Sequence, residues 1–345
     1  MAEQHSTSDT TPRIGLEIAN SAMRLTVTLG GAPGARRWHT RLGAPPEPAE
    51  ALDAIHALIA RALADETANV VSTAIGVAFW GAVDAARSQI AGTFGARLAP
   101  GWESFPLGER LAARWGGPVR IETATNAAAL AEARLGAGRG YDGVLYALLG
   151  RSVTSALVIG GRVWRGASGR AGLLGHWLAY PETPLEALQV AAGQAPAPRC
   201  ICGMRGHLDP IASAQSLTRN MIGRASDSEE SHAAMLRISG RRAEAMTAPQ
   251  VVELAALGDP AAVSVLKDAL VPLSAALANL IAVLDPGVIV IGGPLADAGD
   301  RFYAPLRERV AALTAPYRQG VEPLPIIAGA LEPFAALRGA TLLAG

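Results

Sequence analysis

The spacing of apolar and polar residues divides the chain into short strands and amphipathic helices. Continuous or alternating apolar runs of three to ten residues predict strands. They lie at 13–18, 23–29, 37–42, 70–79, 144–149, 153–159, 162–164, 287–291 and 324–328, and a further short strand begins at 119. Apolar spacings of three and four predict helices. These lie at 46–65 and 106–115, from about 184, 212, 228, 248 and 259, at 297–312 and at the C-terminus. Another helix, which ends at 136–140, follows the strand that begins at 119, and 81–102 is expected to be irregular.

The order of these elements predicts the class of fold. Three strands, with the turn Ala19-Asn20-Ser21 between the first two, are followed by alternating strands and helices. The same theme then starts again at residue 144, with a hairpin turn at Gly160-Gly161. A chain of 345 residues with this repeated pattern is typical of an α/β protein with two lobes.

The amino-acid composition limits the kinds of molecule that the protein is expected to bind. The formal charge is zero, with 30 basic and 30 acidic residues. Nucleic acids and anionic membranes both require an excess of positive charge on one face, so we expect neither DNA binding nor membrane association. Residues 1–12 are polar and lack the apolar core of a secretory signal, which predicts a disordered lead and a cytoplasmic protein. The uncharged run 269–284 is shorter than a bilayer span and contains Pro272, so it predicts a core helix.

Two places in the sequence stand out for their chemistry. At 119–130 a buried strand leads directly into an alanine-rich helix, and ligands in α/β proteins gather at such carboxyl ends of strands. Cys200 and Cys202 are too close together for an ordinary structural disulfide, and in a cytosolic chain such a pair indicates metal binding before redox chemistry.

Four separate segments carry a resemblance that covers almost the whole chain. They are Gly160–Gly172, Gly175-His176, Cys200–His207 and Val288–Gly293. In order and spacing they resemble the ROK family of sugar kinases and sugar-responsive repressors. The resemblance implies the two-lobed actin-like, hexokinase-like ATPase fold, with ribonuclease H-like lobes and a central cleft for sugar and nucleotide. It also implies a homodimer or homotetramer. We expect an N-terminal lobe at 13–118, a C-terminal lobe at 119–329, and a helix at 330–345 that packs back on the first lobe.

The chain departs from this family at the catalytic position. Family kinases carry Glu-Asn-Asp-Ala-Asn at the strand–helix junction, where the Asp is the general base. Here the run is Glu122-Thr123-Ala124-Thr125-Asn126, so Ala124 stands at the position of the base and Thr123 at that of a sugar-binding Asn. A shifted register does not rescue the base, because no Asp lies within residues 120–132.

The phosphate and sugar positions also differ. The first phosphate loop, Asp-x-Gly-Gly-Thr in the family, is Glu17-Ile18-Ala19-Asn20-Ser21. In the second loop only Gly150 of the family glycines is kept, and Arg151 could either pair with phosphate or block the site. Gly292 and Gly293 resemble the adenosine-side turn, although such a pair is common in α/β folds. These departures make ATP and magnesium binding doubtful.

The sugar side keeps some polar groups. Leu173 replaces a Glu that holds sugar hydroxyls, and Asp209 replaces a second Glu after the metal motif. Trp102 could stack on a sugar ring or serve only in packing. The expected ligand-side residues are therefore Glu122, Thr123, Asn126, Asp209 and Trp102.

The resemblance implies a structural zinc site in the segment 199–209. Family members bind zinc through one His and three Cys, and here His176, Cys200 and Cys202 are in place while His207 stands at the third Cys. Two Cys and two His form an ordinary closed tetrahedral zinc set. The alternative is two free thiols beside two incidental histidines.

A chain with this resemblance has four candidate functions. The leading hypothesis is a pseudokinase, a ROK scaffold repurposed to bind a sugar-like small molecule or a partner protein. The second is an ATP-dependent sugar or amino-sugar kinase that uses Glu122 or Asp209 as the base. A ROK-type repressor would need a DNA-binding domain, and only 13 residues precede Ile14. The fourth is a lyase-like enzyme with Glu122, Thr123, His176 or Asp209 in its site.

Overall fold

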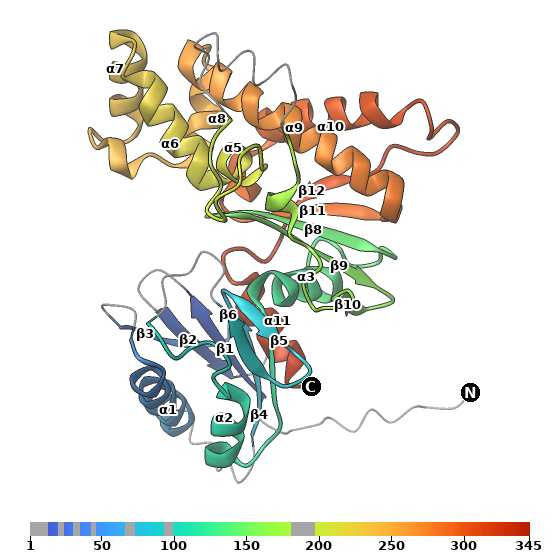
Figure 1. The fold of residues 1–345 in the computed structure, drawn as a ribbon. Coiled ribbons are helices and arrows are strands. Elements are labelled where there is room, and N and C mark those ends of the chain that lie inside the picture. The colour runs from blue at the N-terminus through green and yellow to red at the C-terminus, as the bar shows by residue number, and fades with distance from the viewer. Residues whose placement is uncertain are drawn as a thin grey trace. The chain divides into compact units, whose positions relative to one another are not determined.

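The computed structural model describes residues 13–19, 24–29, 35–42, 46–65, 73–92, 99–180 and 197–345. The chain forms two compact units (Figure 1). Unit 1 contains residues 1–131 and 334–345, and unit 2 contains residues 132–333. The chain thus passes between the units inside the helix that follows residue 123 and again after residue 333. The predicted lead at 1–12 and the helix predicted from residue 184 lie outside the described residues.

Unit 1 is built on a five-stranded sheet in the order β3-β2-β1-β4-β7. Its strands are β1 (Arg13–Ala19), β2 (Arg24–Leu29), β3 (Arg37–Arg41), β4 (Ala74–Phe79) and β7 (Val119–Thr123). The first three pair antiparallel, whereas β4 and β7 run parallel to β1. The carboxyl ends of β1, β4 and β7 therefore meet at one edge of the sheet.

Helices cover both faces of this sheet. They are α1 (Pro48–Asp65), α2 (Leu107–Trp115) and α11 (Ala335–Leu343), while α3 (Ala124–Leu135) follows β7 directly. The apolar stripe of α1 joins the core through Ile55, Leu58 and Ile59. On the opposite face α11 lies directly on Gly15 and Gly76, where a side chain would collide with the helix backbone. The short strands β5 (Ala82–Asp84) and β6 (Gln89–Gly92) form a hairpin within the segment predicted to be irregular.

Unit 2 repeats the strand arrangement of unit 1. Its sheet has the order β10-β9-β8-β11-β12, made by β8 (Val144–Leu149), β9 (Val153–Ile159), β10 (Arg162–Trp164), β11 (Val288–Gly292) and β12 (Ile326–Ala328). Again the first three strands pair antiparallel, and β11 and β12 run parallel to β8. The shared order confirms the repeated pattern expected from the sequence.

The helices of unit 2 gather on one face of its sheet (Figure 1). They are α5 (Asp209–Ala212), α6 (Ala214–Ala225), α7 (Glu229–Ile238), α8 (Ala248–Ala256), α9 (Pro260–Leu284) and α10 (Asp300–Thr314), with short 3₁₀ turns η1 (Leu174–His176), η2 (Ala243–Ala245) and η3 (Pro294–Ala298). Asp259 caps α9 by accepting the Ala262 N–H at 2.9 Å. Among the described residues, α9 alone is long and apolar enough to cross a membrane, and 61% of its most apolar window is buried, as in a core helix.

Candidate functional site

Residues 122–126 form the junction between β7 and α3. The Glu122 carboxylate is buried, and its Oε1 accepts hydrogen bonds from the Thr123 N–H and the Asn126 side-chain amide, each at 2.9 Å. Thr123 Oγ1 accepts the Asn126 N–H at 3.2 Å, which caps the first turn of α3. Ala124 is buried and presents only a methyl group. The polar side chains of this junction thus brace the start of the helix.

A second buried carboxylate lies on the same face of the sheet. Glu17, Ala78 and Glu122 are register partners on three parallel strands, so their side chains point to one face. Glu17 is 3% exposed, and its Oε1 accepts the Trp80 indole N–H at 2.9 Å. The sequence did not predict that Glu17 and Glu122 lie on the same face, because this depends on the register of strands that are far apart in the chain. The rest of the first loop, at 20–21, lies outside the described residues.

Trp102 is a core residue of unit 1. It is 0% exposed, its indole N–H donates to the Pro46 carbonyl at 3.0 Å, and its ring stacks on Phe79 with 6.1 Å between centroids. A ligand can stack only on a ring face that it can reach. The geometry therefore favours the packing role of Trp102 over the expected role in ligand stacking.

The loop after β8 carries the predicted nucleotide-side residues Gly150 and Arg151. The Gly150 N–H donates to the Ser152 carbonyl at 3.2 Å, and the Val153 N–H donates to Asp209 Oδ1 at 2.7 Å. Arg151 is exposed. Phosphate loops bind through open backbone amides. Two amides of this loop instead have partners within the protein.

Asp209 is the first residue of α5 and lies two residues after His207, a predicted metal ligand. Burial raises the pKa of its carboxyl group, and the Val153 N–H together with the nearby charges of His176, Arg219 and His207 opposes this shift. Its Oδ1 accepts the Val153 N–H at 2.7 Å. Asp209 thus connects the segment of the metal ligands to the beginning of β9.

The turn at Gly292 and Gly293 is held by a residue that sequence reasoning missed. Glu332 Oε1 accepts the Gly293 N–H at 3.0 Å and the Tyr146 hydroxyl at 2.6 Å. Burial raises the pKa of Tyr146, and the Glu332 carboxylate adds to the shift, so the phenol keeps its proton and donates. Glu332 lies 39 residues from the amide that it binds, and no local pattern marks it.

The four predicted metal ligands meet in unit 2. The ligand atoms of His176, Cys200, Cys202 and His207 all lie within 4.8 Å of one another. His207 Nδ1 is 3.3 Å from His176 Nδ1 and 3.3 Å from Cys202 Sγ. A tetrahedral zinc with Zn–N bonds of about 2.0–2.1 Å separates two nitrogen ligands by about 3.3 Å. The donor set and its spacing therefore fit a four-coordinate metal ion.

Backbone contacts shape the loop that presents the two thiols. The Cys200 N–H donates to the Met204 carbonyl at 2.8 Å, and the Gly203 N–H donates to the Cys200 carbonyl at 2.9 Å. Gly203 has φ +95°, which favours glycine. The tight turn holds both sulfur atoms on the side of the histidines.

Protonation of this cluster depends on its surroundings. Burial raises the pKa of the Cys200 thiol to about 11, and the Cys202 sulfur nearby adds to the shift. Burial and the neighbouring His176 lower the pKa of His207, which favours the neutral imidazole. Metals bind thiolate and neutral imidazole, so binding here releases protons from the thiols.

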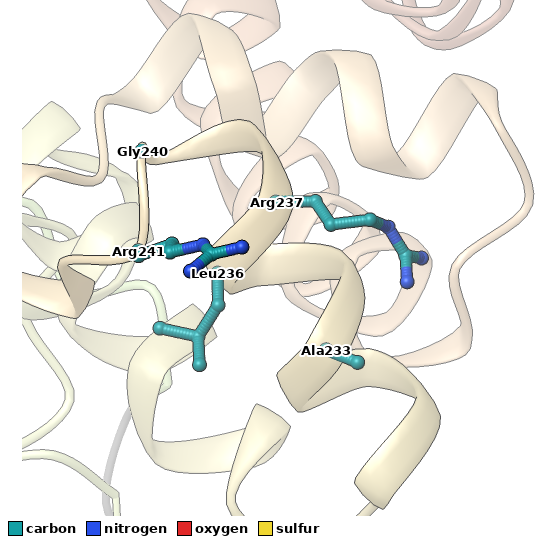
Figure 2. Close-up of a pocket in the computed structure, with 5 residues that line it drawn as sticks. All are labelled: Ala233, Leu236, Arg237, Gly240 and Arg241. Carbon is teal, nitrogen blue, oxygen red and sulfur yellow. The ribbon is translucent and has the colours of Figure 1, made fainter.

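One pocket in the described residues lies apart from these groups. It has a volume of about 650 Å³ and opens at the carboxyl end of α7 (Figure 2). Its lining consists of Ala233, Leu236, Arg237, Gly240 and Arg241. None of the residues predicted to bind a ligand, a nucleotide or a metal is among these five. The pocket therefore does not coincide with the chemistry-bearing side chains.

The repeated sheet order, with candidate polar residues at the ends of parallel strands, defines the class of the protein. It is an α/β protein of the actin-like, hexokinase-like ATPase fold. The ROK family model matches residues 14–345, and the chain belongs to the ROK family. This confirms the fold class and the family expected from the sequence motifs.

Similar proteins include several sugar kinases. The chain is 33% identical to a glucokinase of Halalkalibacterium halodurans over 63% of this chain and 61% of that one, so the match spans less than two thirds of the relative. It is 29% identical to a glucokinase of Thermotoga maritima over 70% of each chain. The crystal structure of a ROK family glucokinase from Streptomyces griseus with glucose and AMPPNP has a TM-score of 0.74 and 27% identity. That match covers 96% of this chain and 98% of the other.

Proposed function

We propose that this chain is a sugar-binding ROK protein with little or no sugar-kinase activity, a pseudokinase whose role is binding or regulation. Its ligand is a sugar-like small molecule, and the working form is a cytoplasmic homodimer or homotetramer. Membership of the ROK family and the sequence similarity to glucokinases support a sugar-like ligand.

The observation that carries the proposal is Ala124 at the start of α3. Family kinases place their general base at this position, and loss of a positioned base typically costs about 10²- to 10⁴-fold in rate. Glu122 lies two residues before this position, and its Oε1 accepts two hydrogen bonds that brace the helix start. Asp209 is tied to the Val153 N–H. We expect neither carboxylate to replace the missing base, because each is held by hydrogen bonds at a position other than 124.

The nucleotide-side groups support the same proposal. The amides of Gly150, Val153 and Gly293 donate to partners within unit 2, namely the Ser152 carbonyl, Asp209 and Glu332. A phosphate that binds these amides must first displace those acceptors. We therefore expect ATP to bind weakly or not at all.

The second candidate is an ATP-dependent sugar kinase. The relatives that are named glucokinases favour it. In that case Glu122 or Asp209 takes the proton from the sugar hydroxyl. The two candidates differ in turnover and in their response to nucleotide, so both can be measured on the same purified protein.

A coupled ADP-release assay with Mg-ATP and a panel of hexoses and amino sugars separates these candidates. We expect turnover well below about 1 s⁻¹, the lower end of ordinary enzyme rates. Thermal shift on the same panel should show stabilisation by at least one sugar, and little or none by AMPPNP with magnesium. Turnover above that rate establishes the kinase, and the absence of any sugar-dependent shift contradicts sugar binding.

We also propose that zinc occupies the cluster of His176, Cys200, Cys202 and His207 as a structural ion. Metal analysis should find one zinc per chain. His207→Ala should lose most of it, whereas His207→Cys should keep it because a thiolate is an equivalent ligand. His232→Ala, an exposed histidine on α7, is the matched control. Zinc content unchanged in His207→Ala contradicts the site.

A further inference from the structure

Two segments that carry histidines of the metal cluster also contact the first residues of β9. His176 ends the turn 172–176, and His207 lies two residues before Asp209. The Nδ1 atoms of the two histidines are 3.3 Å apart. Both segments reach the same short stretch, 153–155, from different parts of the chain.

The first segment touches β9 through its backbone. The Gly172 carbonyl accepts the Ser155 N–H at 2.7 Å and the Ser155 hydroxyl at 3.3 Å. A side chain on Gly172 would collide with the Ser155 carbonyl, and one on Gly175 would collide with the Val153 carbonyl. The absence of side chains at Gly172 and Gly175 therefore lets this turn lie directly against the start of β9.

The second segment touches β9 through Asp209. Its Oδ1 accepts the Val153 N–H at 2.7 Å. The two segments also contact each other, because the Leu208 N–H donates to the Trp177 carbonyl at 3.0 Å. The turn 172–177, the stretch 207–209 and the start of β9 therefore form one three-way junction beside the cluster.

We propose that metal occupancy of the cluster controls the conformation of residues 150–155, with Asp209 as the positioning residue. A bound ion joins His176 and His207 and so closes the two segments on the start of β9. Without it, the junction is held by its hydrogen bonds, each of which contributes only about 0.5–1.5 kcal/mol, and by the packing of Leu174 and Leu208 in the core. The inference rests on the proposed zinc site, but it is independent of whether the chain has kinase activity.

Hydrogen–deuterium exchange on the full chain tests this coupling. After zinc is removed with a chelator, peptides spanning 150–156 should exchange at least about 10-fold faster, and re-addition of zinc should restore protection. Peptides from α9 and β11 should be unchanged. If 150–156 keeps its protection after chelation, the coupling is overturned. If α9 and β11 open to the same extent, the ion supports the whole unit and the specific coupling is overturned as well.

Variants separate the coupling from metal binding itself. Asp209→Ala should keep one zinc per chain but give fast exchange at Val153 with or without metal, whereas Asp209→Asn keeps an acceptor and should stay close to wild type. Arg224→Ala removes an exposed ion pair with Asp268 and is the control. Protection at Val153 that is unchanged in Asp209→Ala overturns the assigned role of Asp209. A wild-type chain that binds no zinc overturns the metal site together with the coupling.

Discussion

Tryptophan side chains of this protein differ widely in burial, and the difference decides what each can do. Trp102 is 0% exposed and Trp164 is 53% exposed. Trp102→Ala should lower the free energy of unfolding by about 3–5 kcal/mol, because it leaves a large cavity in the core. Trp164→Ala should change it by less than about 0.5 kcal/mol. Denaturant unfolding measures both changes. A Trp102→Ala protein that is as stable as wild type but has lost sugar binding would show that Trp102 contacts the ligand.

A pH effect is expected from a single histidine in unit 1. The Trp115 indole N–H donates to His56 Nδ1 at 3.1 Å, so that nitrogen must be unprotonated. Burial lowers the pKa of His56, Arg114 adds to the shift, and Asp53 opposes it. As pH falls below about 6.5, the unfolded chain takes up a proton at this position more readily than the folded chain, so stability falls.

His56→Gln isolates this contribution, because its amide oxygen still accepts a hydrogen bond but does not titrate. Thermal unfolding between pH 7.5 and 5.5 should show a larger loss of stability for wild type than for the variant. Equal losses in the two proteins would show that His56 does not titrate differently on folding.

At the scale of whole elements, the packing of α11 on the sheet of unit 1 depends on missing side chains. A Cβ at Gly76 would overlap the Ala340 backbone. Gly76→Ala should therefore destabilise unit 1 by about 1–3 kcal/mol through overpacking. Gly223→Ala in α6 has open space at the same atom and should be neutral or stabilising by up to about 1 kcal/mol. Urea unfolding of the two variants compares them, and equal effects would mean that α11 moves freely.

At the scale of the whole molecule, activity requires groups from several elements at once. Ala124→Asp supplies the missing carboxylate but leaves the amides of Val153 and Gly293 bound to Asp209 and Glu332. We therefore expect no turnover above about 1 s⁻¹ in the coupled assay. Position 124 is buried, so a larger side chain strains it whether or not it carries a charge. Ala124→Asn has nearly the same size as Ala124→Asp without the carboxylate, and it is therefore the control for size. Turnover above that rate in Ala124→Asp alone would mean that the carboxylate at position 124 is the one group that this chain lacks for kinase activity.

Element-level predictions succeeded where the signal is local. The apolar periodicity of α1, the long uncharged run of α9 and the continuous apolar runs of β8 and β11 are properties of consecutive residues, and the structure confirms these elements. The hairpin β5–β6 was missed because its strands have three and four residues, too short for a periodic pattern. The helix predicted from residue 184 stays a prediction.

The sequence by itself determined the α/β class, the family and the set of four candidate metal ligands. Periodicity and motifs are properties of short stretches of sequence, so they can be recognised without the tertiary structure. Only the tertiary structure decided that Trp102 is enclosed, that Glu17 and Glu122 share one face of a sheet, and that Glu332 holds the Gly293 amide. Strand register and side-chain burial join residues that are tens of positions apart. These contacts arise only when the sheets and helices pack, and no local pattern encodes them.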